Sequence, residues 1–405
     1  MTGIRRDKPT VLGFAQLSLF AWVVYGLGAS LALLRDDQGT TRALSGLHGT
    51  SLAVAGIAAA LGAPALMRRW GRGRVMRWCT IAVTVAIVGL LIPQAPYPMT
   101  MAAVASIGFF GTALMISVNA FLYEHQGAAA PAALTEGNAI ASVAGLIAPL
   151  TIGLFATTVL GWRMGVLIAA IGMAAVEIIR GSTRPYGVAP RAASDDGTSS
   201  LPAPRLSRSF YLSMILIVCF IGAEYSLVFW GPDLLRDRAG FGPAAAAASL
   251  AAVTSGMAIG RAFGARLALR FRPIVLLRSA LVIALVGFIL SWTVPSGTVI
   301  ISGLFVTGLG LSVLWPLGLA RAIEAADGRA NVAASRASLF VNIAIALAPF
   351  ALGVLADLSD IHLALLLVPA FLVTALLILA GTRGPATTTR AGDARDVESG
   401  AAGLR

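Results

Sequence analysis

The chain has 405 residues, of which 58% are hydrophobic and only 12% are charged, whereas a soluble domain carries about 25% charged residues. No soluble fold of this length could bury so much apolar surface, so lipid must be the solvent for much of the chain. The net charge of +12 does not indicate nucleic-acid binding, because the basic residues lie in short segments between long apolar runs.

Twelve apolar segments, each of a length that can cross a bilayer as a helix, follow one another along the chain. The first six are expected at 11–34, 46–67, 75–95, 99–123, 134–159 and 161–180. The second six are expected at 209–231, 243–267, 273–294, 297–321, 331–356 and 361–382. The pattern predicts an all-α polytopic membrane protein of twelve transmembrane helices.

The segments between and beyond these spans divide the chain. We expect an N-tail at 1–10, a six-helix half at 11–180, a linker at 181–208, a second six-helix half at 209–382 and a tail at 383–405. The linker is rich in Pro, Ser and Gly, which predicts a flexible connection. The tail is small and polar, and we expect it to be disordered.

The basic residues predict the orientation of the chain in the membrane. With twelve spans, 25 of the 30 Lys and Arg residues fall on the side that holds both termini and the linker, and five fall on the other side. Basic residues are enriched on the cytoplasmic side of membrane proteins. We therefore expect a multi-pass protein of a bacterial-type plasma (inner) membrane, with both termini in the cytoplasm.

The two halves share an internal repeat. Arg35 and Asp36 recur as Arg236 and Asp237 at an offset of 201, and Pro149 recurs as Pro349 at an offset of 200. The end of the second span matches the end of the eighth at the same offset of 201. Parallel repeats of six helices are found in one class of transporter, in which the substrate site lies between the halves near the midplane.

The loop between spans two and three resembles the signature of the major facilitator superfamily. Its core is Arg69-Trp70-Gly71-Arg72, although Arg68 occupies the position that is acidic in the family. Gly161-Trp162-Arg163, at the entry to span six, is also similar to the family. The resemblance covers essentially the whole chain. It implies two pseudo-symmetric six-helix halves, with spans one, four, seven and ten lining a central cavity.

Glu224 is the clearest candidate for a functional side chain, because it lies well inside span seven. An ionisable group within a span is costly and points to function. Spans one, four, seven and ten offer no Arg or Lys near their middles to hold it ionised. We interpret Glu224 as the proton- or substrate-coupling residue, and the alternative is a structural glutamate bonded to a neighbouring helix.

Further polar and aromatic residues are candidates for the substrate cavity, where rings with a polar edge suit a small organic solute. They are Trp22, Tyr25, Asn119, Tyr225, Trp230, Trp315 and Asn342. Two alternatives stay open for this set. Aromatic residues such as Trp230 also form belts at the membrane surface, and Asn119 and Asn342 can simply join neighbouring helices through hydrogen bonds.

A second set of residues is expected at the cytoplasmic face, as a gate. Glu136 begins span five, and the repeat places Arg336 at the matching point of span eleven. Each would meet the opposite half of the protein when the cavity closes on that side. The signature residues Arg69, Gly71 and Arg72 complete the expected gate. The alternative for Glu136 is a solvated helix end, where a carboxylate is favourable near the helix N-terminus.

The sequence favours a secondary active transporter that moves a small organic solute, coupled to protons, by alternating access. Sequence motifs of metalloproteases, serine hydrolases and nucleotide-binding loops are absent, so we expect neither an enzyme nor a cofactor or metal. We expect a monomer whose partners are the solute, protons and the lipid bilayer, and not nucleic acid. The alternatives are a drug or cation efflux antiporter and a non-transporting membrane sensor or scaffold.

Overall fold

The computed structural model describes residues 4–181, 207–268, 270–326 and 330–381, and every regular element in these ranges is a helix. The expected tail at 383–405 lies outside the described residues, as does most of the expected linker, from 182 to 206. Helix α1 begins at Lys8, inside the segment expected as the N-tail.

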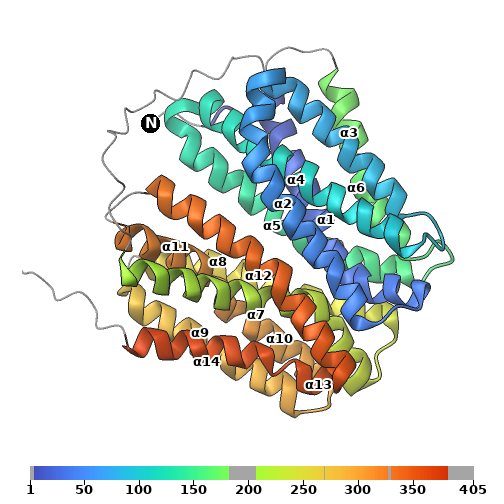
Figure 1. The fold of residues 1–405 in the computed structure, drawn as a ribbon, viewed down its shortest axis with the longest axis vertical. Helices are drawn as coiled ribbons and strands as arrows, with labels where there is room; N and C mark the ends of the chain where they lie inside the picture. Colours follow the sequence, from blue (N-terminus) through green and yellow to red (C-terminus); the bar gives the residue numbers. More distant parts are fainter. Residues whose placement is uncertain (1–3, 182–206, 269, 327–329, 382–405) are drawn as a thin grey trace, which may run out of the picture.

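The first half of the chain forms one bundle of long helices, coloured blue to green in Figure 1. Its helices are α1 Lys8–Gln38, α2 Arg42–Trp70, α3 Arg72–Leu90, α4 Tyr97–Gln126, α5 Ala130–Ala156 and α6 Arg163–Arg180, with a short 3-10 turn, η1, at Gly127–Ala129.

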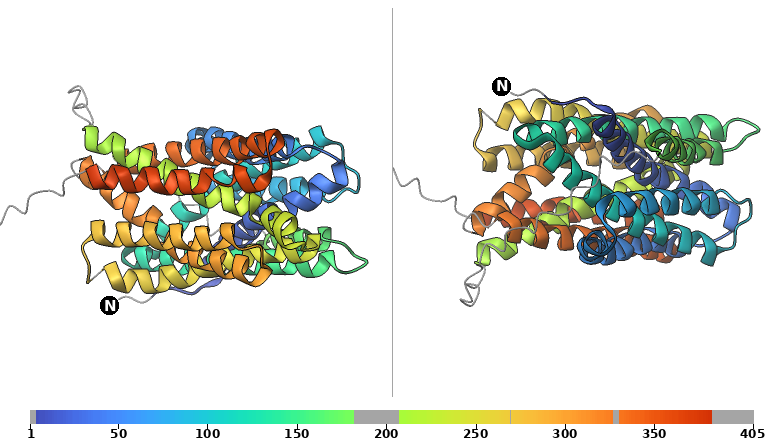
Figure 2. Two further views of the ribbon diagram at one scale, coloured as in Figure 1. Left: turned by 90° about the horizontal axis from the view of Figure 1, so that it is seen from below. Right: turned by 90° about the horizontal axis from the view of Figure 1, so that it is seen from above.

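The second half forms another bundle, coloured yellow-green to red in Figure 1. Its helices are α7 Arg208–Ala239, α8 Pro243–Ala268, α9 Pro273–Thr293, α10 Gly297–Leu311, α11 Leu314–Ala325, α12 Ala330–Leu358, α13 Ile361–Ala364 and α14 Leu367–Gly381. Seen from two other sides, the helices of both bundles still run along a common direction, as membrane-spanning helices must (Figure 2).

These helices make twelve crossings. Helices α10 and α11 together form one apolar span, Gly297–Ala325, and α13 and α14 form another, Ile361–Gly381. Eleven segments of the described chain are long and apolar enough to cross a membrane. The twelfth crossing is α6, which has 18 residues and carries Arg163, Glu177 and Arg180. The predicted all-α fold of twelve transmembrane helices is confirmed.

The repeat is visible in the way the first helix of each half begins and ends. The side chains of Asp7 and Ser207 accept hydrogen bonds from the backbone N–H groups of Thr10 and Phe210, and so cap the starts of α1 and α7. Both helices end at a glycine in the left-handed conformation, Gly39 with φ 60° and Gly240 with φ 65°. Local sequence therefore sets the same helix boundaries in both halves.

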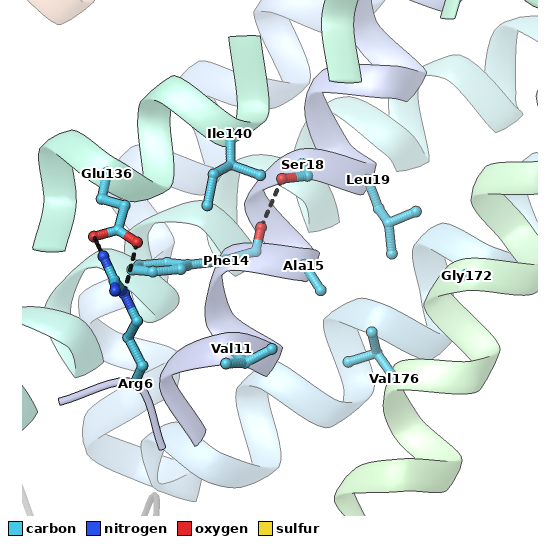
Figure 3. A pocket seen from close by; sticks show the side chains of 10 residues that line it. All are labelled: Arg6, Val11, Phe14, Ala15, Ser18, Leu19, Glu136, Ile140, Gly172 and Val176. Carbon is cyan, nitrogen blue, oxygen red and sulfur yellow. Dashed lines mark hydrogen bonds and ion pairs between the residues drawn. The ribbon is translucent and has the colours of Figure 1, made fainter. Parts of the chain in front are cut away.

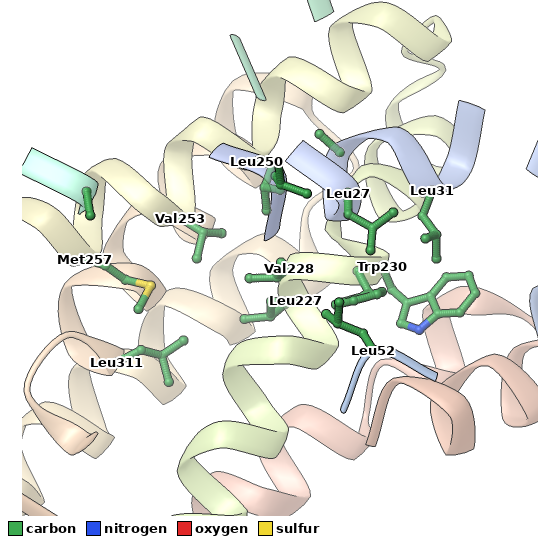
Figure 4. Packing of buried hydrophobic residues seen from close by; sticks show 14 of the residues in the cluster. Leu27, Leu31, Leu52, Leu227, Val228, Trp230, Leu250, Val253, Met257 and Leu311 are labelled. Carbon is green, nitrogen blue, oxygen red and sulfur yellow. The ribbon is translucent and has the colours of Figure 1, made fainter. Parts of the chain in front are cut away.

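The two bundles meet along helices from each half. α2 packs against α12, α5 packs against α8, and α1 contacts α7 and α8. Apolar side chains of α1 and α2, including Leu27, Leu31 and Leu52, lie beside Val228 and Trp230 of α7 in one continuous core (Figure 4). We call the end of the molecule with the α1–α2 loop the Gly39 end, and the end with the α2–α3 loop the Gly71 end.

Candidate functional site

Glu224 lies inside α7 and is 7% exposed. The charged and titratable groups that interact with it are Arg261 of α8, Tyr25 of α1 and its own neighbour Tyr225. These residues come from both halves of the chain, so the Glu224 cluster, meaning Glu224, Arg261, Tyr25 and Tyr225, lies at the interface between the two bundles. Tyr25 and Tyr225 were both expected near the substrate.

Arg261 gives this cluster a positive charge. It lies within the apolar span Pro243–Gly264, yet its side chain is exposed. It makes a side-chain hydrogen bond with Tyr25 and interacts electrostatically with Glu224 and Tyr225. No direct ion pair joins its guanidinium to the Glu224 carboxylate among the contacts of the described residues. Two opposite charges on neighbouring helices of the second half, α7 and α8, therefore act on each other without being locked together in an ion pair.

A close helix contact fixes the position of Tyr25. Its ring lies against the backbone of Gly145 in α5, where a Cβ atom would come within 2.7 Å of the ring carbon Cδ2. Any larger residue at this position would push the ring away. The glycine of α5 thus holds the Tyr25 hydroxyl beside Arg261.

Sequence reasoning missed Arg261. It lies within the expected span 243–267, but we looked for a cation only in spans one, four, seven and ten. The structure places Arg261 on α8 and close enough to act on Glu224, so span eight supplies a cation that spans one, four, seven and ten do not. The repeat could have singled out Arg261, because no charge occupies the equivalent position of the first half. The residues 200 and 201 positions earlier, Leu61 and Ala60, are both apolar.

The predicted tryptophans lie in three different environments. The indole N–H of Trp22 donates to the carbonyl of Gly165 at 3.0 Å, and that of Trp230 donates to the carbonyl of Pro349 at 2.9 Å. Trp230 is 1% exposed, so it belongs to the core and not to an interfacial belt. Trp315 is partly buried and packs against the same apolar cluster as Tyr225.

The two predicted asparagines differ in what their side chains contact. The Asn342 side-chain N–H donates to the Ser338 carbonyl of its own helix at 2.8 Å. Its Oδ1 points toward α2, since a Cβ atom on Gly56 would lie 3.2 Å from it. The Oδ1 atom of Asn119 in α4 is buried and has no hydrogen-bond partner among the described residues. Asn342 therefore reaches across the interface, and Asn119 holds an unused acceptor.

Ion pairs tie the two halves together at the Gly39 end. Arg35 at the end of α1 pairs with Asp233 of α7. Arg236 pairs with Asp36 at 2.8 Å, and Arg42 pairs with Asp237 at 2.7 Å. Asp233 is 1% exposed, so its pair with Arg35 is buried. Every cross-half ion pair of the described residues lies at this end.

The backbone of α2 adds to this set of contacts. The N–H groups of Arg42 and Ala43, in its first turn, donate to the carboxylate of Asp357 in α12 at 3.0 and 2.7 Å. A carboxylate at a helix N-terminus is favourable, because it satisfies free N–H groups and opposes the helix dipole. The Gly39 end is therefore closed by polar contacts that cross the interface.

Comparison with known families now identifies the chain. The model of the Major Facilitator Superfamily matches residues 13–334. The chain belongs to the major facilitator superfamily. It is thus a membrane transporter and not an enzyme, as the sequence predicted.

Solved structures of major facilitator transporters share the fold. A bacterial homologue of the human lysosomal transporter Spinster, in an inward-facing and occupied conformation, is 15% identical with a TM-score of 0.71, over 92% of this chain and 95% of that one. A variant of the nucleoside transporter NupG is 14% identical with a TM-score of 0.74, over 92% and 98%. A search of curated proteins found no match.

The superfamily's signature loop is well ordered by its own contacts. Gly71 joins α2 to α3 with φ 81°, a conformation that favours glycine. Arg72 is 6% exposed and forms a two-pronged ion pair with Glu124 of α4, with N–O distances of 2.8 and 2.6 Å. Arg69 is exposed and forms no ion pair within the described residues. In this conformation the loop is therefore bound to its own half.

The two expected gate residues at the Gly71 end do not meet the opposite half here. Glu136 forms a two-pronged ion pair with Arg6, just before α1, with both N–O distances at 3.1 Å. Arg336 of α12 is exposed. Both residues are thus available for other contacts when the halves rearrange.

A separate pocket of about 550 Å³ lies beside the Arg6–Glu136 pair (Figure 3). Its wall is formed by apolar side chains of α1, α5 and α6, and all its lining residues belong to the first half. The Glu224 cluster contributes none of them. The pocket is therefore distinct from the interface where the charged groups of the two halves meet.

Proposed function

We propose that this major facilitator protein is a proton-coupled secondary active transporter of a small organic solute, working as a monomer. The observation that supports it is the Glu224 cluster. A buried carboxyl at the interface of the two bundles can bind and release a proton as its surroundings change. We propose that residues 11–180 and 209–382 move against each other as the two halves, with 181–208 joining them.

The test of this function is accumulation in proteoliposomes. Purified protein is reconstituted, an inward pH gradient is imposed, and uptake of labelled organic acids, nucleosides, sugars and cationic drugs is measured. Accumulation of one class above its equilibrium level, lost when a protonophore is added, supports the proposal. Transport of every accepted solute only down its own gradient, whatever the pH, contradicts proton coupling.

We further propose that the Gly71 end faces the cytoplasm of a bacterial-type inner membrane, because basic residues gather on the side of both termini. A single cysteine at Ser199, in the linker, is expected to react with an impermeant maleimide only in permeabilised cells. A cysteine at Val159, which is fully exposed in the α5–α6 loop at the Gly39 end, is the matched control and should react in intact cells. Labelling of the Ser199 position in intact cells would reverse this orientation.

With this orientation the closed Gly39 end is the end that faces away from the cytoplasm. We propose that Glu136 and Arg336, with the loop residues Arg69, Gly71 and Arg72, form the gate that closes the Gly71 end in the opposite conformation. Glu136 would then exchange Arg6 for a partner in the second half. In this proposal the gate opens and closes as Glu136 changes its ion-pair partner between the two conformations.

Charge reversal tests this gate. Glu136→Arg and Arg336→Glu are each expected to slow transport, and the double variant should recover part of the loss, with a coupling of about 0.5–3 kcal/mol. The double-mutant cycle is calculated from the initial transport rates of the wild type, the two single variants and the double variant. Arg6→Gln is the control for loss of the pair seen here. Strictly additive effects would show that Glu136 and Arg336 are independent helix ends.

A further inference from the structure

The guanidinium of Arg261 has binding capacity that the protein does not use. An arginine has five N–H donors in a rigid fork that matches a carboxylate. Tyr25 provides its one side-chain hydrogen bond among the described residues, and Glu224 and Tyr225 act on it only electrostatically. A charge inside a spanning helix is costly and faces protein or water. Its exposed surface therefore lies between the halves, where a solute must pass.

Glu224 is placed to respond to whatever binds Arg261. The charged and titratable groups that face it are Arg261 from α8, Tyr25 from α1 and Tyr225 from α7. The described parts of α10 to α14, all of which also pack on α7, contribute none. Within the part of the chain that the structure describes, Arg261 is thus the one positively charged group that acts on Glu224. Any anion that binds the guanidinium takes away the charge that favours an ionised Glu224.

We propose that the solute carries a carboxylate, which binds to the guanidinium of Arg261, and that Glu224 takes up one proton for each carboxylate bound. This inference rests on the transport function proposed above and names the class of solute. The chain would then carry organic anions together with protons.

Charge balance explains the coupling. With Glu224 ionised in the empty site, its negative charge and the positive charge of Arg261 would cancel. A bound carboxylate would leave one net negative charge in a place where charge is poorly solvated. A proton taken from water onto the Glu224 carboxylate restores neutrality, and its release on the other side accompanies release of the solute. A cationic solute would not bind in this place, because the positive charge of Arg261 would repel it.

The first test compares matched ligands with the purified full-length protein at neutral pH. Benzoate, benzamide and benzylamine share one ring, and hexanoate, hexanamide and hexylamine share one chain. The two carboxylates are expected to raise the midpoint of thermal unfolding, and the amides and amines are not. Arg261→Gln should weaken carboxylate binding about tenfold or more, because it removes a charge-assisted fork.

Two further variants keep this test decisive. Arg266→Gln removes an exposed arginine from the same helix and should bind carboxylates normally. Arg261→Lys keeps the charge but loses the fork, so it should bind with intermediate affinity even if Arg261→Gln proves too unstable to measure. Carboxylate binding that is equal in the wild type and in the Arg261 variants overturns the inference. Thermal stabilisation by the amines alone, or no stabilisation by either carboxylate, would also overturn it.

The second test measures the proton directly. In weakly buffered solution, benzoate or hexanoate is expected to draw one proton per bound molecule into the wild-type protein and none into Glu224→Gln, which still binds the anion. Binding without proton uptake by the wild type overturns the coupling. If carboxylates bind in a way that depends on Arg261 but no solute enters liposomes, the transport proposal is wrong. The proposed carboxylate site would still be supported.

Discussion

Glu224→Gln is expected to abolish the accumulation of solute driven by a pH gradient, while exchange of solute for solute continues. Gln resembles the protonated carboxyl in shape and in lacking charge, but it cannot release a proton. The loaded carrier can still change conformation, because the solute balances Arg261. The empty carrier cannot return easily, because Arg261 then faces no negative charge in a poorly solvated place. Net transport stops, and exchange remains.

Proteoliposomes distinguish these two activities. Uptake under an imposed pH gradient measures accumulation, and uptake of labelled solute into vesicles preloaded with unlabelled solute measures exchange. Glu224→Asp keeps a titratable group and should retain pH-driven uptake. Glu324→Gln, which removes an exposed carboxylate from α11, is the matched control and should behave as wild type. Normal pH-driven accumulation by Glu224→Gln would show that Glu224 is structural.

The sequence predicted the fold well because the fold follows from local features. Length and apolarity define each crossing, and capping residues such as Asp7, Ser207, Gly39 and Gly240 define where helices begin and end. A repeat at one offset then relates the halves. None of these features depends on which helix lies beside which, so a single sequence is enough to recover them.

The candidate site could be predicted only in part, because it depends on contacts between helices. Glu224 was visible as a charge within an apolar run. Arg261 was not assigned to the site, although it lies within the expected span 243–267, because the register of α8 against α1 and α7 cannot be read from one sequence. The ion pairs of the Gly39 end were missed for the same reason. Nothing in the sequence alone places Arg35 of α1 beside Asp233 of α7.

Asp233→Asn is expected to open the Gly39 end. The Arg35–Asp233 pair has side chains that are only 11% and 1% exposed, so removing Asp233 takes its hydrogen-bonded carboxylate from a largely buried arginine. Breaking such a pair costs about 3–5 kcal/mol. The cost falls on the conformation in which the Gly39 end is closed, because the pair joins opposite halves. A change of about 3 kcal/mol shifts a two-state equilibrium by roughly a hundredfold.

Distances between spin labels at Val159 and Ser296, on loops of opposite halves at the Gly39 end, measure this shift. The wild type should show a single short population, and Asp233→Asn should add or favour a longer one. Asp237→Asn is the matched control: its pair with Arg42 has side chains 26% and 41% exposed, and exposed pairs contribute about 0–1 kcal/mol. The exchanged pair, Arg35→Asp with Asp233→Arg, should restore the short distance. Equal distances in Asp233→Asn and the wild type would show that the pair does not control access, and that the apolar contacts between α1 and α7 close this end without it.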